Sequence, residues 1–325
     1  MALLKNIDEL RSHIPFTLGM TMKNLDSFIE TAELQFLVPE IGVEAYNDLQ
    51  AKYDANNLNE DYLKLLKLCQ RAVAYYATLL FIPVGQLQLS DAGIRIQVDE
   101  HFKQAFDWQV DNLEESCRNA ADSCIESALS FLELKKNVFT IWAASTAYTQ
   151  YKEWFVNSAE LMNSLVSVQV PRRIFRRVLP EVRKAHENYV LPTICKEIYT
   201  ELKTQWSTNT LTSANKELMR FIQPAIAHIA IAKSVSALTV RLSDMGVSVT
   251  SNSIFKQKIN QPADESSRSH FIREKMDDGQ NYIKQLLEYL YANADTYPLF
   301  KNSLCYVESR VTTLNNDTTS GFYVV

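Results

Sequence analysis

The chain has 325 residues, of which 46% are apolar and 22% charged, and its formal net charge is −5. It is long enough to bury two full-sized hydrophobic cores, and its acidic balance excludes a general nucleic-acid-binding coat. Only seven glycines and nine prolines occur, which leaves few sites for Gly-rich phosphate loops and favours long helices with few tight bends.

The first residues lack the charged leader and apolar core of a signal peptide. The most apolar runs, 74–84 and 224–232, are too short to span a bilayer. The five cysteines form an odd set without a CxxC pair, which is typical of reduced thiols. We therefore expect a soluble protein that is made in the cytoplasm.

One segment of the chain is duplicated. Residues 32–104 recur at 185–257 without a gap, so that the frame PxIxxExYxxL begins at Pro39 and again at Pro192. The same offset relates Gln70 to Gln223. A repeat of about one domain's length predicts two tandem copies of one unit. We place the first helical unit at 1–155 and the second, with an extended C-terminal tail, at 156–325.

The first copy opens with apolar residues at helical spacing over 25–36, and the predicted helix ends before Pro39. A second helix follows Pro39, and a long one carries the apolar positions of 63–77. The pattern then alternates around an LSDxG turn, which predicts a β-hairpin near 87–98. A segment of the same form predicts a hairpin near 240–250.

Each copy is expected to close with a long helix, over roughly 111–135 and 266–291, where the offset between the copies has grown to 158. A further helix over 139–165 would bridge the two copies. The predicted fold class is therefore mainly α with short β-hairpins, arranged as two tandem helical units that carry one hairpin each.

No motif in the sequence predicts catalysis. There is no G-x-S-x-G nucleophile turn, no phosphate-binding G-x-x-x-x-G-K or G-x-G-x-x-G, and the five histidines are scattered without metal-ligand spacing. Cys69 and Cys195 lie on apolar helical faces, where buried packing is the expected role. We expect a protein that is not an enzyme, with no catalytic residues, no cofactor and no metal site.

Two features are candidate interaction sites. Four arginines stand close together in the second copy only, and a solvated face, an acidic protein partner and nucleic acid phosphates all remain open as explanations. An apolar end with high strand propensity follows the polar spacer 314–320 and has no counterpart in the repeat. The candidate residues are Arg172, Arg173, Arg176, Arg177, Phe322, Tyr323, Val324 and Val325.

When each copy of the repeat is considered as a unit, the chain resembles a known group of proteins. The helix that ends at a Val-Pro or Leu-Pro step, the IGxEAYxxL helix from Ile41 to Leu49, the Ala-rich helix and the LSDxG hairpin resemble phage and prophage head–tail connector (adaptor) proteins. The resemblance covers roughly 20–135 and 172–291.

This resemblance implies a non-enzymatic structural protein of the virion, assembled in the bacterial host cytoplasm. It implies a homo-oligomeric ring that meets portal or other phage structural proteins, with no membrane contact and only incidental contact with nucleic acid. The alternative is a cytoplasmic helical protein-interaction module with no virion role. An enzyme of unknown chemistry is a third, more remote class.

Overall fold

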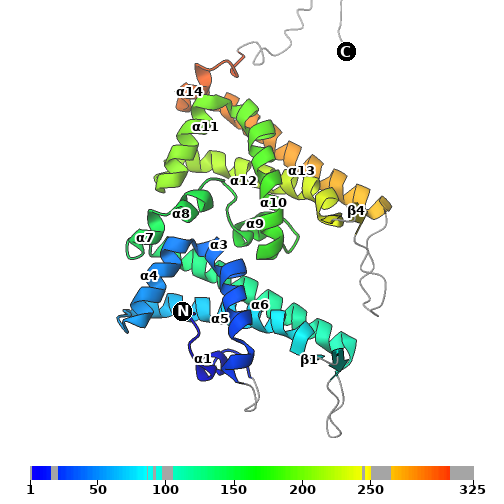
Figure 1. Ribbon diagram of the computed structural model, residues 1–325. Helices are drawn as coiled ribbons and strands as arrows, with labels where there is room; N and C mark the ends of the chain where they lie inside the picture. The colour runs from blue at the N-terminus through cyan, green and yellow to red at the C-terminus, as the bar shows by residue number, and fades with distance from the viewer. Residues whose placement is uncertain are drawn as a thin grey trace, which may run out of the picture. The chain divides into compact units, whose positions relative to one another are not determined.

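The structure is a computed structural model, and it describes residues 2–15, 21–85, 87–90, 93–96, 105–243, 246–249 and 265–307. The chain divides into two compact units, which are described separately (Figure 1). Unit 1 comprises Met1–Glu153, Asn157–Val178 and Ser236–Arg268, and unit 2 comprises Trp154–Val156, Leu179–Val235 and Ser269–Val325. The chain passes between these units more than once, whereas a single boundary at 155/156 is expected from the sequence.

Unit 1 begins with short helices that lead to a bend. In order they are α1 (Ile7–Arg11), the 3₁₀ turn η1 (Met22–Asn24), α2 (Asp26–Ala32), the π-helical turn η2 (Glu33–Leu37), α3 (Val38–Ile41) and α4 (Val43–Asp54). The side chain of Asn6 caps α1 by accepting a hydrogen bond from the backbone N–H of Glu9. Gly42 separates α3 from α4 at a φ of 84°, a conformation that glycine adopts without strain.

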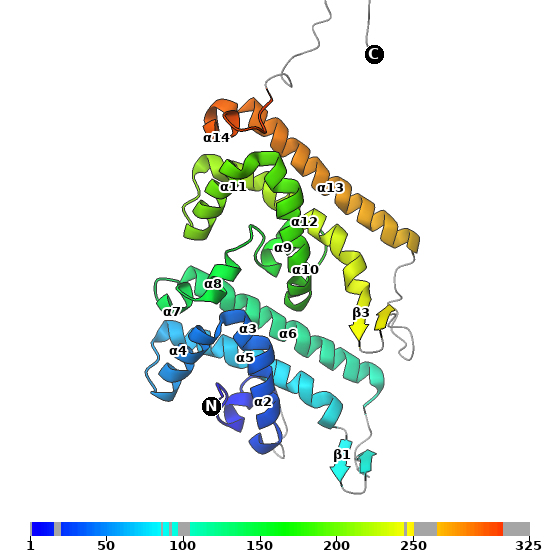
Figure 2. The same cartoon turned by 45° about the horizontal axis from the view of Figure 1, so that its top comes forward.

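Two long helices, α5 (Glu60–Gly85) and α6 (Asp107–Leu134), form the centre of unit 1 and lie side by side in both views (Figures 1 and 2). Helix α5 is long and apolar enough to cross a membrane, but 61% of its most apolar stretch is buried inside the fold. Its buried positions, among them Leu65, Cys69, Ala72 and Val73, face the same core as Ile125 of α6. The apolar character of α5 thus reflects its position as the core helix of unit 1.

The strands are few and short. β1 (Leu87–Ser90) pairs antiparallel with β2 (Gly93–Ile96), and β3 (Val240–Ser243) pairs with β4 (Gly246–Val249). Each pair stands alone as two strands and joins no larger sheet in the part of the chain that is described.

Over the described residues the fold class is all-α, so the expected class of mainly α with a β-hairpin in each unit is corrected. Alternating apolar residues led to the mixed class. Two strands of four residues cannot bury enough surface to form a layer of their own, so the strand pairs that the alternation marks do not change the fold class.

The segment between the copies contains short helices in place of the single helix expected over 139–165. These are α7 (Thr140–Ala143), α8 (Thr146–Tyr151) and α9 (Ala159–Leu165), followed by α10 (Arg172–Ala185). Serine side chains interrupt the segment because each caps a new helix. Ser145 accepts from the N–H of Tyr148, and Ser158 accepts from the N–H of Leu161. The expected bridging helix is therefore wrong.

Unit 2 repeats the helical elements of unit 1. Its elements are the π-helical turn η3 (His186–Val190), α11 (Leu191–Thr208), α12 (Ser213–Thr239), α13 (Glu265–Ala292), the 3₁₀ turn η4 (Ala294–Thr296) and α14 (Pro298–Lys301). η3 and α12 begin 153 positions after η2 and α5, and α13 begins 158 positions after α6. The duplication read from the sequence is thereby confirmed for the order of the helices.

Close packing of α12 and α13 depends on Gly279. A Cβ atom at this position would lie 2.5 Å from Cγ1 of Ile229 and 3.2 Å from the carbonyl oxygen of Ala225. The two helices approach so closely here that only a residue without a side chain fits between them.

The cysteines differ from expectation. Cys195 and Cys305 form a disulfide across 110 residues, whereas Cys69, Cys117 and Cys124 are buried free thiols. The prediction of five reduced thiols is wrong for this pair, because no short spacing marks two cysteines so far apart in the sequence.

Candidate functional site

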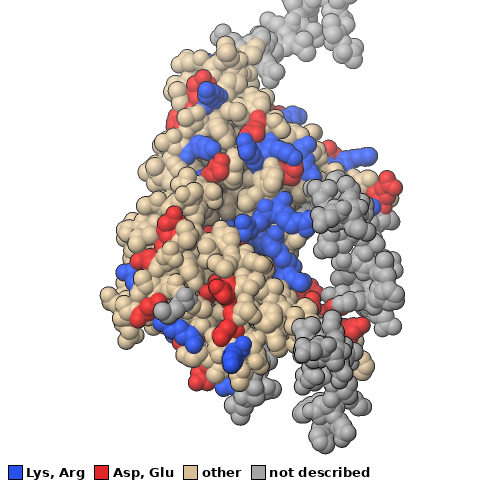
Figure 3. Space-filling view, viewed as in Figure 1, with Lys and Arg blue, Asp and Glu red and all other residues tan. Residues whose placement is uncertain are grey.

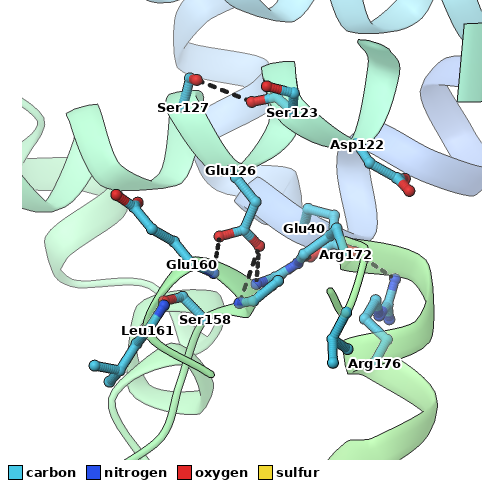
Figure 4. A network of polar contacts seen from close by, with 12 residues as sticks. Glu40, Asp122, Ser123, Glu126, Ser127, Ser158, Glu160, Leu161, Arg172 and Arg176 are labelled. Carbon is cyan, nitrogen blue, oxygen red and sulfur yellow. Dashed lines mark hydrogen bonds and ion pairs between the residues drawn. The ribbon is translucent and has the colours of Figure 1, made fainter. Parts of the chain in front are cut away.

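The first of the four predicted arginines lies inside unit 1. Arg172, the first residue of α10, is only 8% exposed. Its Nε and Nη2 atoms donate to Oε2 of Glu40 at 3.1 and 2.8 Å, and its Nη1 atom donates to Oε1 of Glu126 at 2.8 Å (Figure 4). Burial disfavours the charge of Arg172, but the two carboxylates outweigh it and raise the pKa of the guanidinium.

Two neighbouring arginines extend this network. Arg176 donates from Nη1 to the second oxygen of Glu40 at 3.0 Å, so one carboxylate joins two turns of α10. Arg173 pairs with Asp122 of α6, whose other oxygen accepts from the hydroxyl of Tyr76 at 2.6 Å. The ion pairs therefore tie the start of α10 to α3 and α6, and the hydrogen bond from Tyr76 adds α5 to the network.

Glu126 also holds the start of α9. Its two oxygens accept from the backbone N–H groups of Ala159 and Glu160, both at 3.4 Å. Further along, the side chain of Asn163 accepts from the N–H of Val170 at 2.7 Å and donates to its carbonyl oxygen at 3.2 Å. We call residues 157–178 the docked segment, because these contacts fasten both of its helical starts to α6.

A groove of about 700 Å³ runs between α6 and the docked segment. Most of its lining residues carry polar side chains, among them Glu115, Asn119 and Ser123 of α6 and Asn163 and Gln169 of the docked segment. Its charged floor is formed by groups that already pair with each other, namely Glu126 with Arg172 and Asp122 with Arg173. The arrangement holds two parts of the fold together by charge-assisted hydrogen bonds.

The candidate residues therefore fall into three groups. Arg172 is committed to Glu40 and Glu126, which replaces its expected role as a surface contact. The side chains of Arg173 and Arg176 are paired but remain 36% and 44% exposed, and Arg177 is exposed. Basic side chains gather on the visible face over α10 (Figure 3). The remaining four candidates lie outside the described residues: Phe322, Tyr323, Val324 and Val325.

The carboxylates of this network were not predicted from the sequence, although the repeat contains a signal for them. At the offsets that relate the copies, Glu40 corresponds to Thr193, Asp122 to Gln280, and Glu126 to Lys284. The acidic groups are thus as specific to the first copy as the arginines are to the second. When one copy of a repeat carries acidic residues and the other carries arginines that their counterparts lack, a contact between the two sets is indicated.

A second set of polar contacts recurs in both units. In unit 1, Oε1 of Glu33 accepts from the N–H of Leu3 at 2.6 Å, and the hydroxyl of Tyr46 donates to Oε2 at 2.8 Å. The side-chain amide of Gln70 donates to the carbonyl oxygen of Leu3 at 2.9 Å. Glu33 and Gln70 thus clamp the backbone of Leu3, which is fully buried, and Tyr46 holds Glu33 in place.

Unit 2 builds the same clamp at the equivalent positions. Nε2 of His186 accepts from the N–H of Phe155 at 3.3 Å, and its Nδ1 lies 3.3 Å from the hydroxyl of Tyr199. Gln223 donates to the carbonyl oxygen of Phe155 at 2.8 Å. The clamped residue comes from the segment 154–156, which explains why this tripeptide belongs to unit 2.

The two clamps differ in charge. Burial raises the pKa of the Glu33 carboxyl in unit 1. Burial, together with the charge of Lys203, lowers the pKa of His186 to about 3. Because Phe155 donates to Nε2, the neutral ring carries its proton on Nδ1, facing Tyr199. In both copies a glutamine holds the backbone carbonyl and a tyrosine meets the group that accepts the backbone N–H, and only that accepting group changes.

Among the residues that the structure describes, no three His, Cys, Asp or Glu side chains are grouped so as to hold a metal ion. A family model described as "Family of unknown function (DUF6712)" matches residues 37–152 and again 190–310. The starts of these matches are 153 positions apart and their ends 158, the same two offsets that relate the copies. No curated protein and no solved structure matches the chain.

Proposed function

We propose that this chain, which belongs to the DUF6712 family, is a non-enzymatic structural protein of a phage or phage-like particle. Copies of the chain form a head–tail connector ring through protein–protein contacts. The ring meets the portal or another structural protein of the particle, is assembled in the bacterial host cytoplasm and remains in the virion.

The observation that carries this proposal is the repeated helical unit. Both copies have the same helix order and the same clamp, and the family model matches each copy once. Their sequence motifs resemble those of connector proteins. A chain with two equivalent units offers two similar contact surfaces, and head-to-tail contacts between such surfaces close into rings when the rotation between neighbours permits.

The exposed basic side chains are the proposed contact with an acidic neighbour. Arg176 and Arg177 are exposed on α10, and Arg176 also pairs with Glu40, whereas Arg172 is buried between its two carboxylate partners. Exposed charges steer association and contribute little to folding stability. The apolar residues Phe322–Val325 are proposed as a second contact, a strand that pairs with a neighbouring protein.

Negative-stain microscopy and mass measurement test this proposal, with the purified chain alone and with a candidate portal protein. We expect closed rings of defined mass, whose formation weakens as salt rises. The double change Arg176→Gln/Arg177→Gln should weaken assembly, whereas Arg220→Gln, on α12, should not. A chain that stays monomeric under every condition would favour the helical interaction module.

The C-terminal contact has its own test. Removing residues 321–325 should abolish assembly and leave the unfolding temperature unchanged, because neither copy of the repeat includes these residues. A truncated chain that assembles normally but unfolds several degrees lower would show that the segment belongs to its own unit.

A further inference from the structure

Cys195 occupies a backbone conformation that suits glycine. It lies at a kink in α11 with a φ of 65° and a ψ of 162°. The equivalent position in the first copy is Gly42, with a φ of 84° and a ψ of 149°. Residues with side chains rarely adopt this region because the Cβ atom crowds the backbone. The second copy therefore carries a side chain where the fold favours none.

The side chain at this strained position has a specific partner. Cys195 is bonded to Cys305, and the two Cα atoms are 5.9 Å apart, a separation typical of disulfides. Cys305 follows α14 and lies beyond the end of the long helix α13. The strain at Cys195 is thus coupled to a covalent link that the first copy lacks.

The two bonded cysteines are also the accessible ones. Cys195 and Cys305 are both partly exposed, whereas Cys69, Cys117 and Cys124 are buried. Burial raises the pKa of the Cys69 thiol to about 12 and raises the pKa of the other two buried thiols. Because the thiolate is the form that reacts, small reagents will exchange with Cys195 and Cys305 first.

We propose that Cys195 and Cys305 form a reversible redox clip that opens in a reducing environment and closes by exchange with a small-molecule disulfide such as glutathione disulfide. One protein thiolate attacks a sulfur of glutathione disulfide and expels a glutathione thiolate, leaving a mixed disulfide. The second protein thiolate then attacks the protein sulfur of that mixed disulfide and expels the other glutathione. The chain loses two electrons and two protons, and glutathione disulfide is reduced to two thiols.

The closed clip fixes the stretch that follows α14. The hydroxyl of Tyr291 donates to the carbonyl oxygen of Cys305 at 3.3 Å and accepts from the N–H of Val307 at 3.1 Å. The ring of Tyr306 stacks on Tyr291 with centroids 5.4 Å apart. When the clip opens, these contacts to one tyrosine hold residues 305–307 without the covalent link to α11. This inference does not depend on the proposed function.

Two variants of the full chain distinguish the effect of the disulfide from the effect of the strained backbone at Cys195. Cys195→Gly restores the residue of the first copy and removes both, while Cys305→Ser removes the bond and leaves the strain. Under reducing conditions the ratio of folded to unfolded Cys195→Gly, from urea titration, should exceed that of the wild type by about tenfold. Cys305→Ser should match the reduced wild type. Under oxidising conditions the wild type should be more stable than both variants.

Thiol labelling gives an independent readout. Brief iodoacetamide treatment of the folded, reduced chain should label Cys195 and Cys305, and treatment after equilibration with glutathione disulfide should label neither. Hydrogen exchange at the amide of Val307 should be several-fold faster in the reduced chain. The proposal is overturned if the pair stays fully labelled in excess glutathione disulfide, or if reduced Cys195→Gly is no more stable than the reduced wild type.

Discussion

The clamp of unit 2 predicts a loss of stability at mildly acidic pH. His186 is buried and neutral, and it accepts the N–H of Phe155 on Nε2. Protonation of that nitrogen would remove the acceptor and place an uncompensated charge in the core. We therefore expect unit 2 to become less stable as the pH falls, well before the carboxylates of the chain are neutralised.

The size of the loss follows from the pKa of His186 in the two states. Burial lowers the pKa of His186 to about 3 in the folded chain, against the ordinary histidine value of 6.5. Because the folded value is the lower one, the stabilisation is complete above pH 6.5 and is lost as the pH falls toward 3. Between pH 7 and pH 5 the unfolded state gains nearly a full proton, which removes about 2 kcal/mol.

Glu33 makes the opposite contribution in unit 1. Its pKa is raised in the folded state, so the folded chain takes up a proton before the unfolded chain does. As the pH falls through the interval between the two pKa values of Glu33, proton uptake by the folded chain therefore stabilises unit 1. A fall in pH should therefore change the stability contributed by the two clamps in opposite directions, although the clamps occupy equivalent positions.

Hydrogen exchange in urea at pH 7 and pH 5 measures the effect in each unit, once rates are corrected for intrinsic pH dependence. The matched variant is His186→Glu, which installs the clamp residue of the first copy. We expect the wild type to lose protection in α11 and α12 at pH 5, and the variant to retain it. Equal protection of wild-type unit 2 at both pH values would refute the reasoning, as would an equal loss in the variant.

Three further changes test the packing and the polar contacts by chemical or thermal unfolding. Arg172→Gln should lower the free energy of unfolding by about 3–5 kcal/mol, because it leaves two buried carboxylates without their partner. Arg177→Gln on the exposed face should change it by less than about 0.5 kcal/mol. Equal effects of the two changes would contradict this difference. Gly279→Ala should destabilise unit 2 by about 1–3 kcal/mol, since its Cβ would overlap Ile229, and an unchanged unfolding temperature would show that the helices move apart freely. Gln223→Leu should cost about 1–3 kcal/mol by leaving the buried carbonyl of Phe155 without a donor, and a neutral result would mean that water replaces the amide.

The helical frame was largely predictable from the sequence. Apolar spacing and the constant offset placed the closing helices within a few residues of α6 and α13, and the apolar positions of 63–77 fall inside α5. Helix length is set by the local pattern and by the turns at its ends. The segment 139–165 was harder, since the caps at Ser145 and Ser158 compete with an otherwise continuous apolar pattern. Alternation near 87–98 also gave too much weight to strands that form no layer.

The contacts of the candidate site could not be predicted from the sequence, for a different reason. Arg172 meets Glu40 across 132 residues and Glu126 across 46, and local patterns carry no information about such pairs. The disulfide between Cys195 and Cys305 was hidden in the same way, although Gly42 in the first copy marks the unusual backbone. Comparison of the two copies position by position would have drawn attention to both, because these residues depart from the repeat.

The central claim is that the chain is a structural part of a phage-type particle. Quantitative mass spectrometry of particles purified by density gradient, from the bacterium that carries the gene, tests it most directly. The account predicts that the chain is present at a fixed ratio to the major capsid protein, and that disruption of its gene leaves filled heads without tails. Normal particles that lack the chain, produced equally well after disruption, would contradict the account.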